Sequence, residues 1–216
     1  NAVASVDGDE LVSAGDGTFK KPSSAGSHTL YASVAASADV SNGVTTEQFF
    51  DKTYSLPAST LVAGDILHIR GHAIVSAAAG TDTLTFKLYI GGVTLLATAA
   101  VNATTADVVT FNAKVTVRDV GATGHIVADV EYSNGVLGTA ILFPTVLAST
   151  AIDTTVANII RASASWSATT ATCTVALQSL SVEIARVVPS ELMAVAIEAL
   201  DNSAVAAEAF LKVRML

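Results

Sequence analysis

The amino-acid sequence predicts an all-β sandwich, and three observations support this prediction. Apolar and polar residues alternate with a period of two from about residue 29 to residue 186, which is the pattern of half-buried strands. Turn-forming Gly, Asn and Asp residues separate the alternating segments. The 216 residues are 51% hydrophobic but only 6% aromatic, so Ala and Val dominate the apolar content. One large sandwich, with or without small appendages, fits this length.

The segment 83–90 illustrates the alternation, because Leu84, Phe86 and Leu88 fall on one face while Thr85 and Lys87 fall on the other. Similar patterns recur at short intervals along the chain. Ten segments are expected to be strands: 29–38, 47–56, 65–75, 83–90, 93–100, 108–120, 125–132, 136–143, 158–167 and 174–184.

Two local signals refine this strand pattern. Asn134-Gly135 is the strongest hairpin signal in the chain and predicts a tight turn over residues 132–136. The alternation shifts phase near Ser179, where Leu177 is followed by Leu180. We therefore expect a β-bulge near Ser179, because a simple slip would turn the core face outward.

The sandwich is expected to occupy residues 28–186, with different segments on either side. Residues 1–27 are rich in Asp, Gly, Ser and Ala without a sustained period, which indicates an extended arm or a flexible tail. Residues 187–216 form an appendage expected to contact another subunit. Its composition favours helices, whereas its alternation of apolar and polar residues favours a β-hairpin, which is the structure we expect.

Charge and composition restrict the expected partners. The net charge of −8 argues against nucleic acid, which requires a surplus of Lys and Arg on one face. No apolar run approaches the length of a membrane helix and no secretion signal begins the sequence, so we expect no membrane partner and synthesis in a cytoplasm. With only 14% charged residues, the chain is expected to bury further surface in a homo-oligomer.

Candidate chemical groups are few. His68 and His72 would lie roughly 13 Å apart on a strand, too far to share one metal ion, and would share the polar face with Arg70. Asp129 and Glu131 share an outward strand face, as any exposed strand allows. The acidic run of residues 7–10 lacks a calcium-loop pattern.

No catalytic, cofactor-binding or metal-binding residue is therefore assigned, and we expect no cofactor and no enzymatic activity. No nucleophile motif accompanies the abundant Ser and Thr residues. Trp166 and the single cysteine, Cys173, are expected in the core. Of the adjacent residues Phe49 and Phe50, one must face away from the core.

Six segments of strand starts and turns are distinctive within residues 30–184. They are Leu30-Tyr31-Ala32-Ser33-Val34, residues 56–70, residues 82–92, Val120-Gly121-Ala122-Thr123-Gly124, Ala151-Ile152-Asp153-Thr154-Thr155 and Ala164-Ser165-Trp166-Ser167. Through these segments the chain resembles a family of tailed-bacteriophage virion proteins over about residues 30–184.

The resemblance implies a jelly-roll-like antiparallel β-sandwich and a structural role in a virion. Members of such families are capsid decoration (cement) proteins, head fibres, or tail-fibre and spike modules. The absence of heptads and shaft repeats favours decoration, with the major capsid protein as partner, a homotrimer as the oligomer and the capsid surface as the location. The alternative is an adhesion module of a tail fibre or spike that binds a host-surface glycan or receptor.

Overall fold

Every regular element that the structure describes is a β-strand. The computed structural model describes residues 12–13, 19–20, 26–41, 46–77, 82–136, 141–167 and 173–186. The chain divides into two units, residues 1–26 with 186–216 and residues 27–185. In the first unit, β1 (Val12–Ser13) pairs antiparallel with β2 (Phe19–Lys20). The expected C-terminal hairpin and most of the expected N-terminal arm lie outside the described residues.

Strands β3 to β14 build the larger unit, which is an antiparallel β-sandwich of a seven-stranded and a five-stranded sheet. Their bounds are β3 (Gly26–Ala32), β4 (Val40–Ser41), β5 (Gln48–Leu56), β6 (Ile66–Ala77), β7 (Thr83–Ile90), β8 (Val93–Ala97), β9 (Val101–Asn102), β10 (Asp107–Asp119), β11 (Gly124–Val136), β12 (Ile141–Ile152), β13 (Asn158–Trp166) and β14 (Thr174–Arg186). The all-β prediction is thus confirmed.

The strand order is that of a jelly roll with an added hairpin. The larger sheet has the order β12-β11-β10-β6-β14-β3, with β4 also paired to β14. The smaller sheet has the order β5-β13-β7-β8, with β9 paired to β7. Without the β11–β12 hairpin and the two short strands, two four-stranded sheets remain, β3-β14-β6-β10 and β5-β13-β7-β8, in the order of two interlocked Greek keys.

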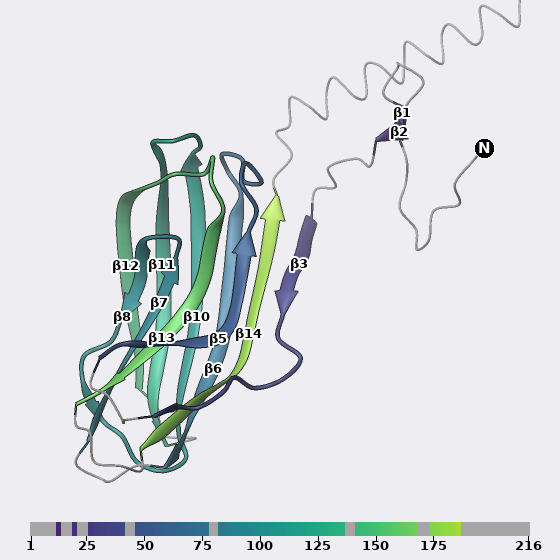
Figure 1. Cartoon of the computed structure of the whole chain (residues 1–216). Coiled ribbons are helices and arrows are strands. Elements are labelled where there is room, and N and C mark those ends of the chain that lie inside the picture. Colours follow the sequence, from purple (N-terminus) through teal and green to yellow (C-terminus); the bar gives the residue numbers. More distant parts are fainter. Residues whose placement is uncertain are drawn as a thin grey trace, which may run out of the picture. The chain divides into compact units, whose positions relative to one another are not determined.

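The first and last strands of the jelly roll are neighbours. Figure 1 shows β3 beside β14 at the edge of the larger sheet, with the start of β3 and the end of β14 at the same end of that sheet. The larger unit therefore begins and ends at one corner.

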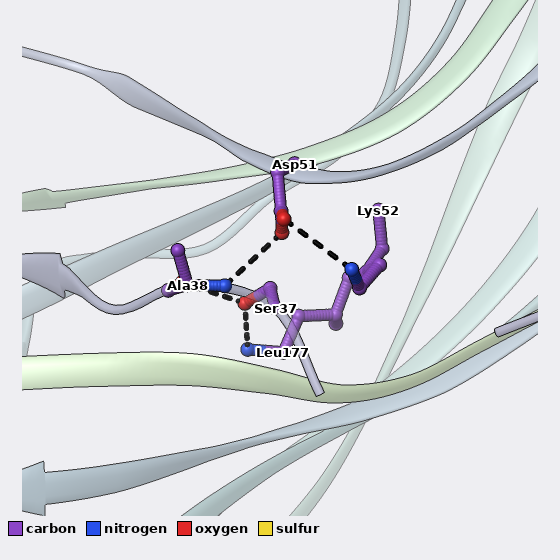
Figure 2. A network of polar contacts seen from close by, with 5 residues as sticks. All are labelled: Ser37, Ala38, Asp51, Lys52 and Leu177. Carbon is purple, nitrogen blue, oxygen red and sulfur yellow. Dashed lines mark hydrogen bonds and ion pairs between the residues drawn. The ribbon is translucent and has the colours of Figure 1, made fainter. Parts of the chain in front are cut away.

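Two serines hold the segment between β3 and β4 against β14. Ser33 donates its amide to the Leu180 carbonyl and accepts the Leu180 amide on its hydroxyl, at 2.9 and 3.0 Å. Ser37 does the same with Leu177, at 2.8 and 2.9 Å. Figure 2 shows Ser37 beside Leu177, and Asp51 of β5 accepting the Ala38 amide at 3.1 Å. Through Asp51 this segment also joins the smaller sheet.

We expect Ser37→Ala to lower the free energy of unfolding by about 1 kcal/mol, because the Leu177 amide loses its acceptor. Ser37 also donates its hydroxyl to the Ala38 carbonyl at 2.8 Å. Urea denaturation measures the loss. Ser181→Ala, on the outer face of β14, is the control and should change stability by less than about 0.5 kcal/mol. An equal loss in both variants would contradict the role of Ser37 as the acceptor for the Leu177 amide.

The sandwich core is centred on three phenylalanines that connect the sheets. The ring of Phe86 on β7 lies 6.0 Å from Phe50 on β5 and 5.4 Å from Phe111 on β10, between ring centroids. Trp166 and Cys173 are also buried, which confirms both core predictions. Phe50 is buried and Phe49 is 44% exposed, so the two adjacent rings face opposite sides of their strand as predicted.

The expected bulge is present and lies over a glycine. The pairing of β14 with β6 shifts register between Leu177 and Ser179, which confirms the bulge predicted near Ser179. Gly71 of β6 lies beneath it: a Cβ at Gly71 would stand 2.3 Å from the Ser179 carbonyl oxygen and 2.6 Å from Cζ of Phe111. Only glycine fits there, and the Phe111 ring fills the space where its side chain would be.

The tight turn predicted at Asn134-Gly135 is wrong. Strand β11 continues through both residues, since Gly135 pairs with Val108 of β10 and Asn134 pairs with Ile141 of β12. In place of the strand expected over 136–143, the structure has β12 (Ile141–Ile152), at the edge of the larger sheet. The expected strand 29–38 also ends early, because β3 stops at Ala32 and the chain leaves β14 at the fully exposed Val34 before Ser37 rejoins it.

Three loops are hydrogen-bonded together at one end of the sandwich. The amide of Ser59 donates to the Thr154 carbonyl at 2.8 Å, and the amide of Thr154 donates to the Gly121 carbonyl at 3.0 Å. Val62, Val120 and Val156, one on each loop, are 45, 46 and 50% exposed. We call residues 57–65, 120–123 and 153–157 the loop platform.

In the part of the chain that the structure describes, no helix is long and apolar enough to cross a membrane.

Candidate functional site

The outer face of the smaller sheet carries most of the polar chemistry that the structure brings together. Alternation places Arg161 and Ser163 of β13 outward, and register places them opposite Tyr89 and Lys87 of β7. On the other side, Arg161 pairs with Thr53 and Ser163 with Phe49 of β5. Residues far apart in the sequence thus form one surface.

Glu47, immediately before β5, is the centre of a hydrogen-bonded group on this face. Its carboxylate accepts hydrogen bonds from Lys87 Nζ at 2.7 Å, from the Tyr89 hydroxyl at 2.6 Å and from the Ser163 hydroxyl at 2.5 Å. We call these four residues the Glu47 cluster. It joins β5, β7 and β13 from outside.

These contacts fix the ionisation of the cluster. Burial alone would raise the pKa of the Glu47 carboxyl, but the hydrogen bonds from Lys87, Ser163 and Tyr89 outweigh it and lower this pKa to about 2. The hydrogen bond to Glu47 raises the pKa of Lys87. A general acid needs a raised carboxyl pKa and an amine nucleophile needs a lowered one, so both shifts fit a structural ion pair.

We expect Glu47→Gln to remove a pH-dependent part of the stability. The pKa of Glu47 is about 2 in the folded chain and 4.5 in the unfolded chain. Its contribution to the free energy of unfolding is therefore complete above about pH 5 and is lost as the pH falls toward 2. The variant should be less stable than the native chain by about 2 kcal/mol at pH 7, and equally stable near pH 2. Urea denaturation of both proteins between pH 7 and pH 2 tests whether their stabilities become equal at low pH.

Glu131→Gln is the control for this experiment, since Glu131 is exposed on β11 of the other sheet. A pH-independent difference between Glu47→Gln and the native chain would contradict the charged role of Glu47.

Arg161 lies beside the Glu47 cluster and has no anionic partner in the part of the chain that the structure describes. Its guanidinium carbon stands 3.7 Å from the centroid of the Phe49 ring, a cation–π contact. Tyr89 also packs edge-on against Phe49, at 5.8 Å between centroids. Among the described residues, Arg161 Nε is buried without a hydrogen-bond partner and no carboxylate pairs with the guanidinium.

Arg161 lines an open groove at the edge of the sandwich, which we call the Arg161 groove. Its volume is about 730 Å³, within the range of small-ligand sites. The groove lies among the β7–β8 turn, the end of β12, the β12–β13 loop and the start of β13. Its lining combines apolar side chains with a few polar ones: Val93, Thr94, Leu147, Thr150, Ile152, Asp153, Val156, Ile159 and Arg161.

Asn158 fixes the wall of this groove. Its side-chain amide donates to the carbonyls of Asp153 at 2.9 Å and Val156 at 3.1 Å. Its oxygen occupies the place of a side chain at Gly91, where a Cβ would stand 2.2 Å from Oδ1. Because Gly91 also has φ of +56°, glycine is required in this turn. The groove is thus built on a rigid frame.

Asp153 is held by its own loop. Its carboxylate accepts the Thr155 hydroxyl at 2.6 Å and the Thr155 amide at 2.8 Å. These two hydrogen bonds lower the pKa of Asp153, so the groove carries one anionic side chain as well as one cationic one.

The outer face of the larger sheet holds the two histidines singled out in the sequence. His68 and His72 lie on the outward face of β6 with Arg70, as expected, opposite Glu183 and Ser179 of β14. His72 Nδ1 is 2.8 Å from the Ser179 hydroxyl. Within the described ranges, no group of three or more His, Cys, Asp or Glu side chains has a metal-binding arrangement.

The other sequence candidates are dispersed. Asp129 and Glu131 share the outward face of β11 as expected, but β10 places Lys114 and Asn112 directly opposite them. Residues 7–10 lie outside the described residues. The Arg161 groove was missed, because its lining comes from separate loops and its only local signal, Gly91-Gly92, indicates a turn and no ligand.

Comparisons with known proteins leave the function open. No protein-family model and no curated protein matches the chain. Among solved structures, dimeric latent PorU from Porphyromonas gingivalis is similar with a TM-score of 0.32 and 13% identity, over 67% of this chain and 10% of that one. Infectious bursal disease virus Gt strain gives a TM-score of 0.32 and 13% identity, over 85% and 41%. The chain therefore spans about a tenth of the first protein and about two fifths of the second, and similarity at this level indicates no function.

Proposed function

We propose that the chain is a structural virion protein that decorates a phage capsid and stabilises the assembled lattice through the major capsid protein. The observation that carries the proposal is the closure of the jelly roll by β3 and β14 at one corner. In the sequence, residues 1–25 directly precede the strand that begins at this corner, and residues 187–216 directly follow the strand that ends there. Two terminal segments that start together are suited to reach the same neighbouring subunits, as lattice-bridging arms do.

The exposed apolar side chains of the loop platform are the second support. Val62, Val120 and Val156 are held by a hydrogen-bonded frame, so little conformational entropy is lost when they are covered. We propose that these three valine side chains are buried between copies of the chain in a homotrimer. We propose no enzymatic activity, and we place the protein on the capsid surface after synthesis in the host cytoplasm.

Electron-microscopy reconstructions of particles with and without the chain test the decoration role. We expect added density over capsid subunit junctions, and shells that break at lower temperature when the chain is missing. Density confined to the tail, with equally stable shells, would overturn the proposal.

Sedimentation equilibrium at micromolar concentration tests the trimer. We expect the mass of three chains for the native protein, and dissociation when Val62, Val120 and Val156 are all replaced by Ser. The control replaces Val146, exposed on β12 outside the platform, by Ser. A native monomer, or an unchanged trimer in the triple variant, would contradict the platform interface.

An adhesion module that binds a host-surface glycan is the second candidate function, and the Arg161 groove favours it. Jelly rolls occur in lectins as well as in capsids, so the fold does not decide between the two. Binding of labelled chain to a glycan array, with no attachment to shells, would favour adhesion over decoration.

A further inference from the structure

We propose that the Arg161 groove binds an acidic saccharide, with the sugar carboxylate on Arg161 and sugar hydroxyls on Asp153. This inference goes beyond the decoration role and does not depend on it, because the ligand would bind to the isolated chain.

The first argument is that no described carboxylate pairs with Arg161. Lys52, Arg70 and Lys87 each have a carboxylate within 4.0 Å, whereas Arg161 has only the Phe49 ring among the described residues. A partly buried guanidinium without an anion loses hydration that a cation–π contact offsets only in part. A bound carboxylate would supply the missing partner, and the planar guanidinium favours a two-pronged contact with it.

The second argument is the arrangement of charge along the groove. Asn158, at the start of β13, donates its side-chain amide to the backbone of Asp153, and Arg161 lies three residues further along β13, roughly 10 Å from Asn158 between Cα atoms by strand rise. The Asp153 carboxylate would repel an anion and accept hydroxyl hydrogens. A ligand that satisfies both positions carries a carboxylate at one end and hydroxyls at the other, as uronic acids and sialic acids do.

The third argument is the apolar part of the groove lining. Val93 and Ile159 line the groove, Ile159 is 43% exposed, and both offer an apolar surface to the C–H face of a sugar ring. Hydrogen bonds from Asn158 and the close contact of its side chain with Gly91 hold the groove wall in place, which limits the entropic cost of binding.

Isothermal titration calorimetry on the full chain tests the proposal with sodium glucuronate, sodium N-acetylneuraminate, sodium acetate and neutral glucose. We expect one or both acidic sugars to bind at least about tenfold more tightly than glucose and than acetate. The two acidic sugars identify which class the groove accepts. Acetate binding as tight as either sugar would overturn the saccharide assignment, and no binding of either acidic sugar at millimolar concentration would overturn the site.

Two variants locate the site. Arg161→Gln should abolish the preference for the acidic sugar over glucose. Thr94→Tyr, on the exposed groove wall of β8, should block the binding of the acidic sugar and of glucose alike. Arg118→Gln, an exposed arginine of β10, is the matched control and should bind as the native chain does. Should Arg161→Gln fail to fold, Thr94→Tyr decides alone: unchanged binding in that variant would overturn the groove as the site.

Discussion

Replacement of Phe86 by Ala should lower the free energy of unfolding by about 4 kcal/mol, the largest loss we expect from a single substitution in this chain. The Phe86 side chain is 1% exposed and its ring stands between those of Phe50 and Phe111. Its removal leaves a cavity at the junction of the two sheets, and β7 and β10, each hydrogen-bonded on both sides, cannot move to fill it. Urea denaturation should show a lower midpoint with an unchanged m-value.

Two further substitutions show whether the loss comes from the cavity. Phe86→Leu fills part of the space and should cost less than half as much. Phe49→Ala removes the same ring from a position that is 44% exposed and should cost at most about 1.5 kcal/mol. Equal losses of stability in Phe49→Ala and Phe86→Ala would mean that the three buried phenylalanines are not the centre of the core.

Replacement of Gly71 by Ala should cost about 3 kcal/mol and lower the melting temperature by roughly 6 to 12 °C. The added methyl group would overlap the Ser179 carbonyl oxygen at 2.3 Å and the Phe111 ring at 2.6 Å. The carbonyl belongs to a bulge whose neighbours are held by Ser33 and Ser37, so the backbone cannot move aside without breaking those hydrogen bonds. Differential scanning calorimetry measures the change.

Gly92→Ala is the matched control, because a Cβ at Gly92 meets no atom within 4 Å. It should leave the melting temperature almost unchanged. If Gly71→Ala melts at the temperature of this control, the bulge is more adaptable than its hydrogen bonds indicate.

The sequence predicts those strands that are half-buried. The expected strand 83–90 matches β7 residue for residue, since every second side chain faces the core. Strand β12 escaped prediction because it lies at the sheet edge and contains Pro144, which an edge strand tolerates. At Asn134-Gly135, hydrogen-bonded neighbours on both sides keep β11 extended, so tertiary pairing overrides a local turn preference.

The candidate site could not be read from local patterns. Ser163 reaches Glu47 across 116 residues of sequence, and Phe49 meets Arg161 only because β5 pairs with β13 in one particular register. Alternation indicates that Arg161 faces outward, but it says nothing of which strand lies beside it. Knowledge of strand order is therefore required before the groove can be recognised.

The pairing of β3 with β14 also determines when folding can be completed. The larger sheet cannot close until the chain has been synthesised through β14, about 150 residues after β3. At ribosomal rates of roughly 5 to 20 residues per second, β3 and the edge of β6 remain unpaired for many seconds. Sheets with such distant partners also fold slowly. Nascent chains therefore expose open strand edges to one another, and crowding of polysomes favours exchange of β3 between copies before each sandwich closes.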